Sequence, residues 1–302
     1  PPTVLLLESA RWFTHEVALA HRDLFDSIHA RLREARGADE IDFLDFLDVV
    51  LPVLGDKFTV SSTMRPVVDR LHATWGELLA VRPDETSRVH RTSAQLRAAV
   101  FERFQAPGPG WPSARYHAPD VMLAARGPEA LARGEFYGVL GEIVVGDHTY
   151  SRPLFLKLHP DGDAWIRSRF ADLGPIVAPV EAAARALRSD HHPPVPEDLD
   201  IEVGDGLSWR SRDQVFGAGE LVVIRSGATL TVRTRDGRRS FDIIECLDMY
   251  LQLTASSHFS LLPKTQHMPR IAIDDLVIAR ESWTFGPEQL EFCRADSKQR
   301  FL

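Results

Sequence analysis

The chain has 302 residues, 44% of them hydrophobic and 26% charged, a composition typical of a globular protein with a sizeable buried core. Its formal net charge of −8 argues against a polyanion binder that works by bulk electrostatics, although it is compatible with a local basic patch. No apolar run approaches the ~20 residues that cross a bilayer, and the first residues do not form a secretory signal peptide. We therefore expect a cytoplasmic protein without a membrane segment.

The two cysteines support the same location. Cys246 and Cys293 lie far apart in the sequence and form no CxxC pair. Structural disulfides are rare in the reducing cytoplasm, so we predict two free thiols, with a single bridge between them as the alternative.

Residues 1–105 are predicted to be helical. Between residues 10 and 36 apolar side chains recur at helical spacing, and Gly37 follows them as a stop signal. These apolar positions are Trp12, Val17, Leu19, Leu24, Ile28 and Leu32. Three more helices are expected: a short one over 41–55 that Pro52 disturbs, one over 61–81, and one over 84–104 with Asp84 and Glu85 at the positive end of its dipole.

The pattern changes after residue 105. Residues 105–119 contain four prolines and two glycines, which end the helical periodicity. β-Branched and aromatic residues then predict a strand over 135–150, and Ser226-Gly227 and Asp236-Gly237 separate alternating strands as tight hairpins require. The other predicted elements are a helix over 161–190 interrupted by Pro175 and Pro179, a loop over 191–200, a strand at 207–211, a helix over 241–257 and a final strand over 269–285.

The expected fold class is therefore α+β, a helical first third followed by a mixed region of β-meander and helix. We expect residues 1–107 to form the helical part and residues 108–302 the α+β part of one continuous module. No fixed-period repeat is present.

No general nucleotide-binding or hydrolase motif occurs, since the chain lacks GxxxxGK[ST], HExxH, GxSxG and a GxGxxG after a strand. A cation loop would draw on Asp147, His148, His159, Asp161 and Asp163, but the glycine and distal glutamate of an EF-hand loop are missing. We therefore expect no metal site, and we expect Asp161 or Asp163 to cap the helix that follows.

A second candidate is the run Ser256, Ser257 and His258, because acyl transfer needs a hydroxyl and a proton acceptor within hydrogen-bond reach. Adjacent side chains rarely point at one another. We therefore favour a local turn in which the serines bond to the backbone.

Residues 110–127, GWPSARYHAPDVMLAARG, bring Arg115, Tyr116, His117 and Asp120 within six positions. They are either a reactive constellation or the polar residues of a turn. In the second interpretation Pro119 fixes the turn, Asp120 caps the next element and Arg115 pairs with an acid. The residues taken alone favour the turn.

The arginines raise a similar choice, since guanidinium groups suit both carboxylates and phosphates. Arg270 and Arg280 each lie at the edge of a predicted element, where a surface ion pair is the favoured interpretation. The hairpin RTRDGRR adds Arg233, Arg235, Arg238 and Arg239, which favour a solvated tip over a phosphate-binding patch.

Three stretches taken together resemble one family. WPSARYHAPDVMLAA (111–125), FYGVLGEIVVGDHTY (136–150) and MPRIAIDDLVIARESWTF (268–285) are similar to the tRNA-dependent glutamylation domain of lantibiotic dehydratases. The same domain occurs in thiopeptide dehydratase components and in peptide aminoacyl-tRNA ligases. The order and spacing of the segments carry the resemblance, which covers roughly residues 10–295.

The resemblance implies transfer of an aminoacyl group, usually glutamyl, from tRNA to a peptide in the biosynthesis of ribosomally made modified peptides. The acceptor is a Ser or Thr hydroxyl in the dehydratases and a peptide terminus in the ligases. The implied co-substrate is aminoacyl-tRNA, the implied partner is a precursor peptide, and no other cofactor is expected. Arg115 would then contact an anionic group, and His117 or Asp120 would orient groups or handle a proton. The implied tRNA-binding residues are Arg233, Arg235, Arg238, Arg239, Arg270 and Arg280.

Two departures from the family leave an alternative open. This chain has Gly141-Glu142-Ile143-Val144 where the family often reads Gly-Glu-Leu-His, so any role of that histidine is absent. The family domain also usually begins several hundred residues earlier and continues further. We therefore expect a fragment, a split subunit completed by a partner chain, or a degenerate paralogue, and the alternative function is a non-catalytic module that binds a peptide or docks on a partner.

Overall fold

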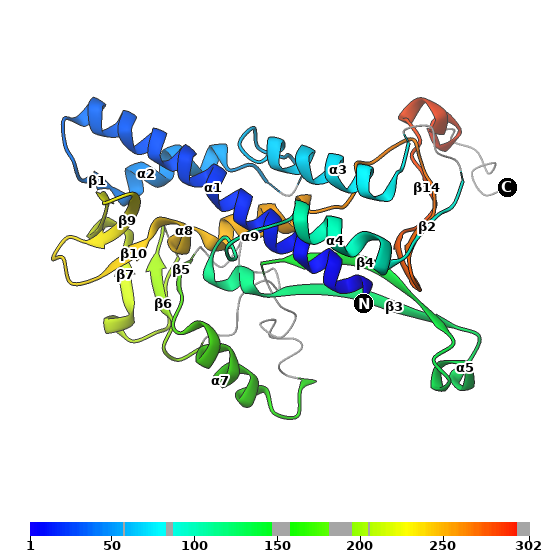
Figure 1. Ribbon diagram of the computed structural model, residues 1–302. Helices are drawn as coiled ribbons and strands as arrows, with labels where there is room; N and C mark the ends of the chain where they lie inside the picture. Colours follow the sequence, from blue (N-terminus) through cyan, green and yellow to red (C-terminus); the bar gives the residue numbers. More distant parts are fainter. Residues whose placement is uncertain (57, 83–86, 147–157, 181–194, 205, 295–302) are drawn as a thin grey trace.

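A computed structural model of the chain describes residues 1–56, 58–82, 87–146, 158–180, 195–204 and 206–294 (Figure 1). The fold class is α+β, as the sequence predicts, with helices first and strands concentrated later in the chain. Within the described residues, no helix combines the length and apolar character that a membrane-spanning helix needs.

The helices fall mainly in the first third and near residue 250. The α-helices are α1 (Pro2–Arg36), α2 (Phe43–Val50), α3 (Arg65–Leu79), α4 (Ser93–Arg103), α5 (Pro128–Ala132), α7 (Gly162–Leu173), α8 (Ile243–Cys246) and α9 (Asp248–His258). The 3₁₀ helices are η1 (Leu51–Val53), η2 (Pro112–Arg115), η4 (Arg212–Gln214), η5 (Ala218–Glu220) and η6 (Pro287–Arg294).

The strands form four sheets. A five-stranded sheet has the order β2 (Val89–Arg91), β12 (Ile271–Ile273), β13 (Leu276–Ala279), β4 (Phe136–Val145) and β3 (His117–Ala125). A four-stranded sheet has the order β1 (Ile41–Asp42), β8 (Leu221–Ser226), β9 (Thr229–Thr234) and β10 (Ser240–Asp242). The smaller sheets are β5 (Val177–Val180), β6 (Leu199–Glu202) and β7 (Val215–Gly217), and the pair β11 (His267–Met268) and β14 (Ser282–Trp283).

Helix α1 packs against both the other helices of the first third and the strands of two sheets. It contacts helices α2, α3, α4 and α9 as well as strands β4 and β9, and it runs between α3 and the β3–β4 hairpin in Figure 1. Its helix stops where the sequence predicts, because Gly37 adopts φ 63° and donates its backbone N–H to the carbonyl of Arg33. Trp12, Val17 and Ile28 are buried as expected, whereas Leu19 is exposed.

Several predicted elements are confirmed. The helix over 41–55 appears as α2 followed by η1 at Pro52, and 241–257 contains α8 and α9. The two predicted hairpin turns hold Gly227 at φ 60° and Gly237 at φ 73°. Asp161 caps α7 by accepting from the backbone N–H of Ala164 at 2.9 Å.

Four predictions are wrong at the level of local structure. Residues 89–91 form strand β2 rather than part of a helix, and α4 begins only at Ser93, where Thr92 and Gln95 make a capping box. Pro179 lies in β5, which is the edge strand of its sheet among the described residues, a position that tolerates a proline. The expected final strand is instead the β12–β13 hairpin plus β14, because Asp274 turns the chain at φ 49°.

The fourth correction concerns residues 207–211, which form no strand. Their side chains bind strand β6 instead: the Ser208 hydroxyl donates to Asp200 at 2.6 Å, and the Arg210 guanidinium donates to Asp200 at 3.0 Å. Such side-chain hydrogen bonds compete with the backbone ladder. Asp84, Glu85, Asp147, His148, His191 and His192 lie outside the described residues.

A buried ion-pair network fastens α7 to the β5–β6–β7 sheet. Arg169 of α7 donates two hydrogen bonds to Asp198 at 2.5 and 3.1 Å, and Asp198 also accepts from the backbone N–H of Ile176 at 3.0 Å. Removing one partner of such a buried pair costs about 3–5 kcal/mol, because the other charge stays buried without compensation. The network therefore fixes the position of α7, which contacts the segment discussed below.

The backbone of the loop before η2 packs directly against the backbone of α1. A Cβ atom at Gly110 would overlap the backbone carbonyl of Thr14 on α1, so this position requires glycine. The next residue, Trp111, is 3% exposed and packs under Gly146. A Cβ atom at Gly146 would lie 2.8 Å from its ring, and Gly146 adopts φ 75°. These contacts fix where β3 starts and where β4 ends.

We expect Gly110→Ala to destabilise the protein by about 1–3 kcal/mol, because the added methyl group must displace the backbone of α1. The measurement is urea unfolding followed by circular dichroism. The matched control is Gly108→Ala in the same loop, where a Cβ atom meets nothing within 4 Å. Equal stability of the two variants would contradict this packing.

Candidate functional site

Arg115 and Tyr116 bind α7 rather than facing an open site. The Arg115 guanidinium lies 3.1 Å from the Asp172 carboxylate and donates to its backbone carbonyl at 3.1 Å. The Tyr116 hydroxyl donates to the same carboxylate. Burial, strengthened by Asp172, raises the pKa of Tyr116 to about 12. Arg115 thus pairs with an acid, one of the two roles that the sequence offers for it.

His117 is held in one protonation state. Its Nδ1 accepts the backbone N–H of Gly146 at 3.2 Å, so the ring proton of the neutral form is on Nε2. Burial lowers the pKa of His117 to about 4, because the interior disfavours the imidazolium. At neutral pH this histidine is therefore a hydrogen-bond donor through Nε2.

Asp120 lies in strand β3 at an irregularity of the ladder. The register shifts between Pro119 and Val121, where Asp120 alone faces Gly141 and Glu142, so β4 carries the extra residue of a β-bulge. The turn expected at Pro119 and the cap of the next element expected at Asp120 are wrong, since both residues belong to β3. The Asp120 side chain is exposed and lies over Gly141 of β4. No hydrogen bond or ion pair in the described part of the chain joins Arg115, His117 and Asp120 to one another.

A buried carboxyl group, that of Asp248, accepts a hydrogen bond from η2. Asp248, the first residue of α9, is 6% exposed and accepts from the Ser113 hydroxyl at 3.3 Å. Burial raises the pKa of Asp248 to about 7, and the nearby Glu245 acts in the same direction. The sequence gives no sign of this contact, because the two residues lie 135 positions apart.

The predicted basic patch is largely neutralised by acids. The ion pairs are Arg233 with Glu40, Arg235 with Asp42 at 2.5 Å, and Arg238 with Asp236 at 3.2 Å. Two of these connect the hairpin to the chain beside β1. Arg238 is exposed at the tip, and the exposed Arg239 forms no ion pair with any residue that the structure describes.

The structure places the side chains of the serine–histidine run, and it also shows whether the described residues form a metal-binding cluster. Ser256 and Ser257 lie on α9 and donate to the carbonyls of Val145 and Leu253, both at 2.8 Å, while His258 contacts the carbonyl of Asp56. They form no nucleophile–base pair, and they bond to the backbone from a helix rather than from a turn. Among the described residues, no cluster of three or more His, Cys, Asp or Glu side chains is arranged to hold a metal ion.

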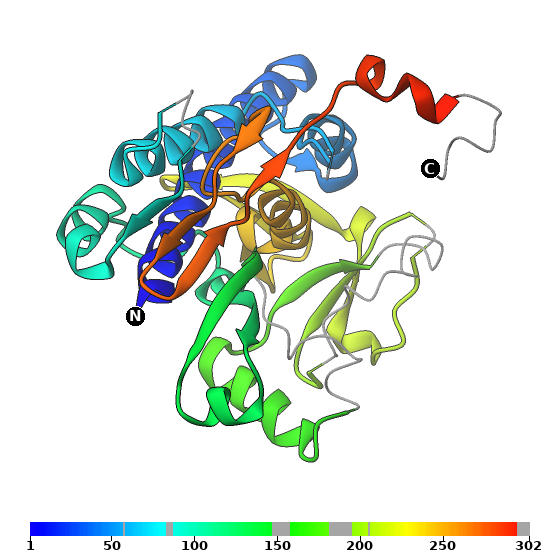
Figure 2. The ribbon, with the colours of Figure 1, turned by 90° about the vertical axis from the view of Figure 1, so that its right-hand side faces the viewer.

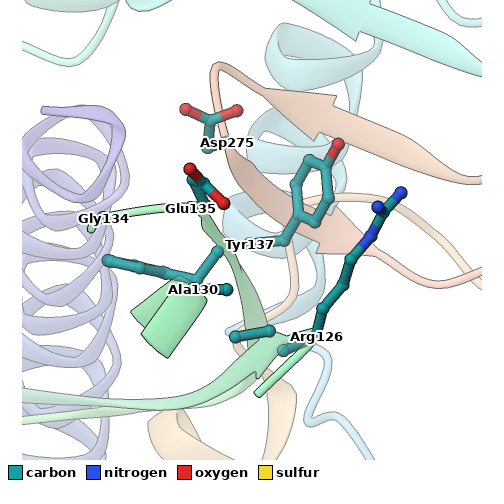
Figure 3. Close-up of a pocket in the computed structure, with 9 residues that line it drawn as sticks. Arg126, Ala130, Gly134, Glu135, Tyr137 and Asp275 are labelled. Atoms are coloured by element: carbon teal, nitrogen blue, oxygen red, sulfur yellow. The ribbon is translucent and has the colours of Figure 1, made fainter. Parts of the chain in front are cut away.

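A groove of about 530 Å³ opens beside the far end of the β3–β4 hairpin (Figure 3). Its lining residues are Ala124, Ala125, Arg126, Ala130, Gly134, Glu135, Phe136, Tyr137 and Asp275. In Figure 3, Arg126 lies on one side of the Tyr137 ring, and Glu135 and Asp275 lie on the other. Its volume is in the range of small-molecule sites.

The charged groups of the groove differ in their partners. Glu135 accepts two hydrogen bonds from Arg133, both at 2.9 Å, and this contact lowers the pKa of the Glu135 carboxyl. Arg126 and Asp275 form no ion pair within the described ranges. No local pattern in the sequence predicts this groove, because Asp275 reaches it through the pairing of β13 with β4.

Of the two remaining predicted arginines, one approaches this groove. The Arg270 guanidinium lies 5.9 Å from the centre of the Tyr137 ring, within the range of a cation–π contact. Arg280 is exposed just after β13, and it does not line the groove.

No protein-family model and no curated protein matches the chain. Solved structures do match. The glutamylation domain TbtB from thiomuracin biosynthesis has 16% sequence identity and a TM-score of 0.47 over 92% of this chain and 37% of that one. The same domain bound to 5′-phosphodesmethylglutamycin has 17% identity, a TM-score of 0.47 and the same coverage.

A third solved structure is the tRNA-dependent lantibiotic dehydratase MibB from Microbispora sp. 107891. It has 19% identity and a TM-score of 0.45 over 84% of this chain and 27% of that one. The chain therefore spans 27–37% of the length of the structures it matches. Their names fall within the family that the three sequence segments resemble.

We expect the pH dependence of stability to report the buried carboxyl of Asp248. Its pKa is raised in the folded state, so folding binds a proton, and stability falls as the pH rises from the ordinary aspartate range through about 7. Asp248→Asn removes this loss. The variant should be more stable than the parent at pH 8, and the difference should shrink toward pH 4. Thermal unfolding across this range provides the measurement.

The control is Asp163→Asn, which changes an exposed carboxyl in the first turn of α7. Its pH profile should follow that of the parent chain. If the stability of Asp248→Asn followed the same pH profile as that of the parent chain, the pKa of Asp248 would not differ between the folded and unfolded states.

Proposed function

We propose that this chain is part of an aminoacyl-tRNA-dependent transferase in the biosynthesis of ribosomally made modified peptides. The observation that carries the proposal is the placement of the three family-like segments. Segments 111–125, 136–150 and 268–285 supply strands β3, β4, β12 and β13, which are consecutive neighbours in one sheet. Two neighbouring segments and a third that lies much later in the sequence thus build one sheet.

In the proposed reaction an acceptor hydroxyl or amine of a precursor peptide attacks the aminoacyl ester of a charged tRNA. The new acyl bond forms as the ester bond to the tRNA ribose breaks, and the acceptor proton passes to the departing ribose oxygen. Holding both substrates in reactive geometry supplies much of the rate, roughly 7–11 kcal/mol at best. Cationic groups near the developing charge supply more.

The contacts that the predicted site residues make in the free chain determine which role each can take in this reaction. Arg115 must exchange Asp172 for an anionic group of a substrate, because its guanidinium is paired with Asp172 in the free chain. His117 serves as a donor through Nε2, since its Nδ1 is occupied by Gly146. Asp120 lies opposite the bulge of β4 as an exposed carboxylate that can orient an ammonium or hydroxyl group.

A second function, a peptide-binding module without catalysis, is favoured by strand β3. This strand is the last of its sheet, so one of its edges pairs with no other strand of the described residues. Its apolar side chains Val121, Met122 and Leu123 are 36–57% exposed. An open edge with apolar side chains suits an extended peptide that adds a strand.

The first experiment is binding of charged and uncharged bacterial tRNA to this chain across a salt series. Specific binding of one charged tRNA that weakens with salt supports the transferase. We expect the double variant Arg238→Ala, Arg239→Ala to bind more weakly and to lower the slope of log K against log salt by about one per lost phosphate contact. The control is Arg103→Ala, which removes a pair with Glu77 on the helical side. Absence of binding near physiological salt contradicts the transferase.

The edge of β3 is tested with a fluorescent precursor peptide encoded beside this chain's gene. We expect Leu123→Lys to weaken peptide binding at least about fivefold, because a charge on the edge disfavours strand addition. The control is Leu207→Lys, which changes a side chain that is 78% exposed in the loop before η4. Equal losses in both variants would contradict a site at this edge.

A further inference from the structure

We propose that the groove beside the β3–β4 hairpin binds a small dipolar ligand, an amino acid or short peptide with a free ammonium and a free carboxylate. The ammonium would contact Asp275 and the carboxylate would contact Arg126. This inference does not depend on the proposed function, since it uses only the residues that line the groove.

The separation of charge within the groove is the first support. Arg126 lies on one side of the Tyr137 ring and the acids lie on the other (Figure 3). A ligand with only a negative charge would be attracted by Arg126 but repelled by Asp275. A ligand with only a positive charge would be attracted by Asp275 but repelled by Arg126. A ligand with both charges at its two ends satisfies both groups, because each faces a charge of opposite sign.

The second support is that the two groups are available. Glu135 is occupied by the two hydrogen bonds from Arg133, which leaves Asp275 as the acid without an ion pair in the described part of the chain. Arg126 also lacks one there. A guanidinium accepts a carboxylate through two parallel hydrogen bonds, whereas an aspartate offers two oxygens to an ammonium.

Backbone hydrogen bonds fix two of the segments that line the groove, the start of β13 and the turn before β4. The carbonyl of Asp275 accepts the N–H of Gly138 at 2.8 Å, which ties the start of β13 to β4. Gly138 also leaves room for the Leu276 side chain, since a Cβ atom there would lie 2.9 Å from it. The carbonyl of Ala130 accepts the N–H of Glu135 at 2.9 Å, which fixes the turn between α5 and β4.

The walls between the charged ends are apolar or aromatic. Ala124, Ala125, Ala130 and Phe136 contribute hydrocarbon, and the Arg270 guanidinium lies 5.9 Å from the centre of the Tyr137 ring. Such walls suit aliphatic or aromatic side chains of a ligand, while the few polar groups set its orientation.

The test uses alanyl-leucine and two blocked forms, N-acetyl-alanyl-leucine and alanyl-leucinamide, with free leucine as a shorter probe. Binding to the full chain is followed by calorimetry and by NMR shifts. We expect alanyl-leucine to bind at least about tenfold more tightly than either blocked form, because each block removes a charge-assisted contact. The relative affinity of leucine then shows whether the groove fits one residue or two.

The variants assign each end. Arg126→Gln should abolish the preference over the amide but keep the preference over the acetylated form, and Asp275→Asn should do the opposite. Arg31→Gln, at an exposed arginine of α1 that does not line the groove, should leave all affinities unchanged. Absence of saturable binding, equal binding of blocked and free peptides, or equal effects of all three variants would overturn the proposal. None of these outcomes bears on tRNA binding, so the two proposals fail separately.

Discussion

The backbone contact between Gly110 and α1 is the constraint on which the rest of the structure depends. Because the loop reaches the carbonyl of Thr14 directly, η2 and the start of β3 have a fixed distance from α1. Trp111 then fills the space under Gly146 and sets the end of β4 relative to the same helix. The five-stranded sheet inherits this placement, from the hydrogen bond of His117 at one end of the β3–β4 hairpin to the groove near its other end. Figure 2 shows the course of this hairpin, with the short helix α5 at its closed end.

Local signals in the sequence predicted local structure well. The stop at Gly37, the cap at Asp161 and the glycine turns at 227 and 237 each depend on one residue's conformational freedom or side-chain reach. Elements decided by distant partners were mispredicted. Strand β2 exists because it pairs with β12, and the expected strand at 207–211 is replaced by side chains that bind β6. The candidate site follows the same rule, since Arg115 meets Asp172 and Ser113 meets Asp248 only in the folded chain.

The arginines show why charge patterning was a weak guide. Several of them join the first forty-two residues to the later meander: Arg22 pairs with Asp242, Arg225 with Asp26, Arg233 with Glu40, and Arg235 with Asp42. Each exposed pair contributes little by itself, about 0–1 kcal/mol. Together they align two segments that lie some two hundred positions apart, as the separation of 220 between Arg22 and Asp242 illustrates. A basic run in a sequence can therefore serve in ion pairs between distant segments of the same chain as readily as in a surface that binds nucleic acid.

The parallel pairing of β2 with β12 has a consequence for how the chain is made. The Ser93 hydroxyl and backbone N–H, just after β2, both donate to Asp274, which lies 181 positions later. On the ribosome, the helical segments emerge long before the strands that complete their sheet. Long-range pairing of this kind forms late and slowly, and it leaves apolar surface uncovered in the meantime. The nascent chain therefore has a long interval in which β2 and the helices beside it lack this sheet, and a stop codon before residue 271 would leave β2 without its partner strand.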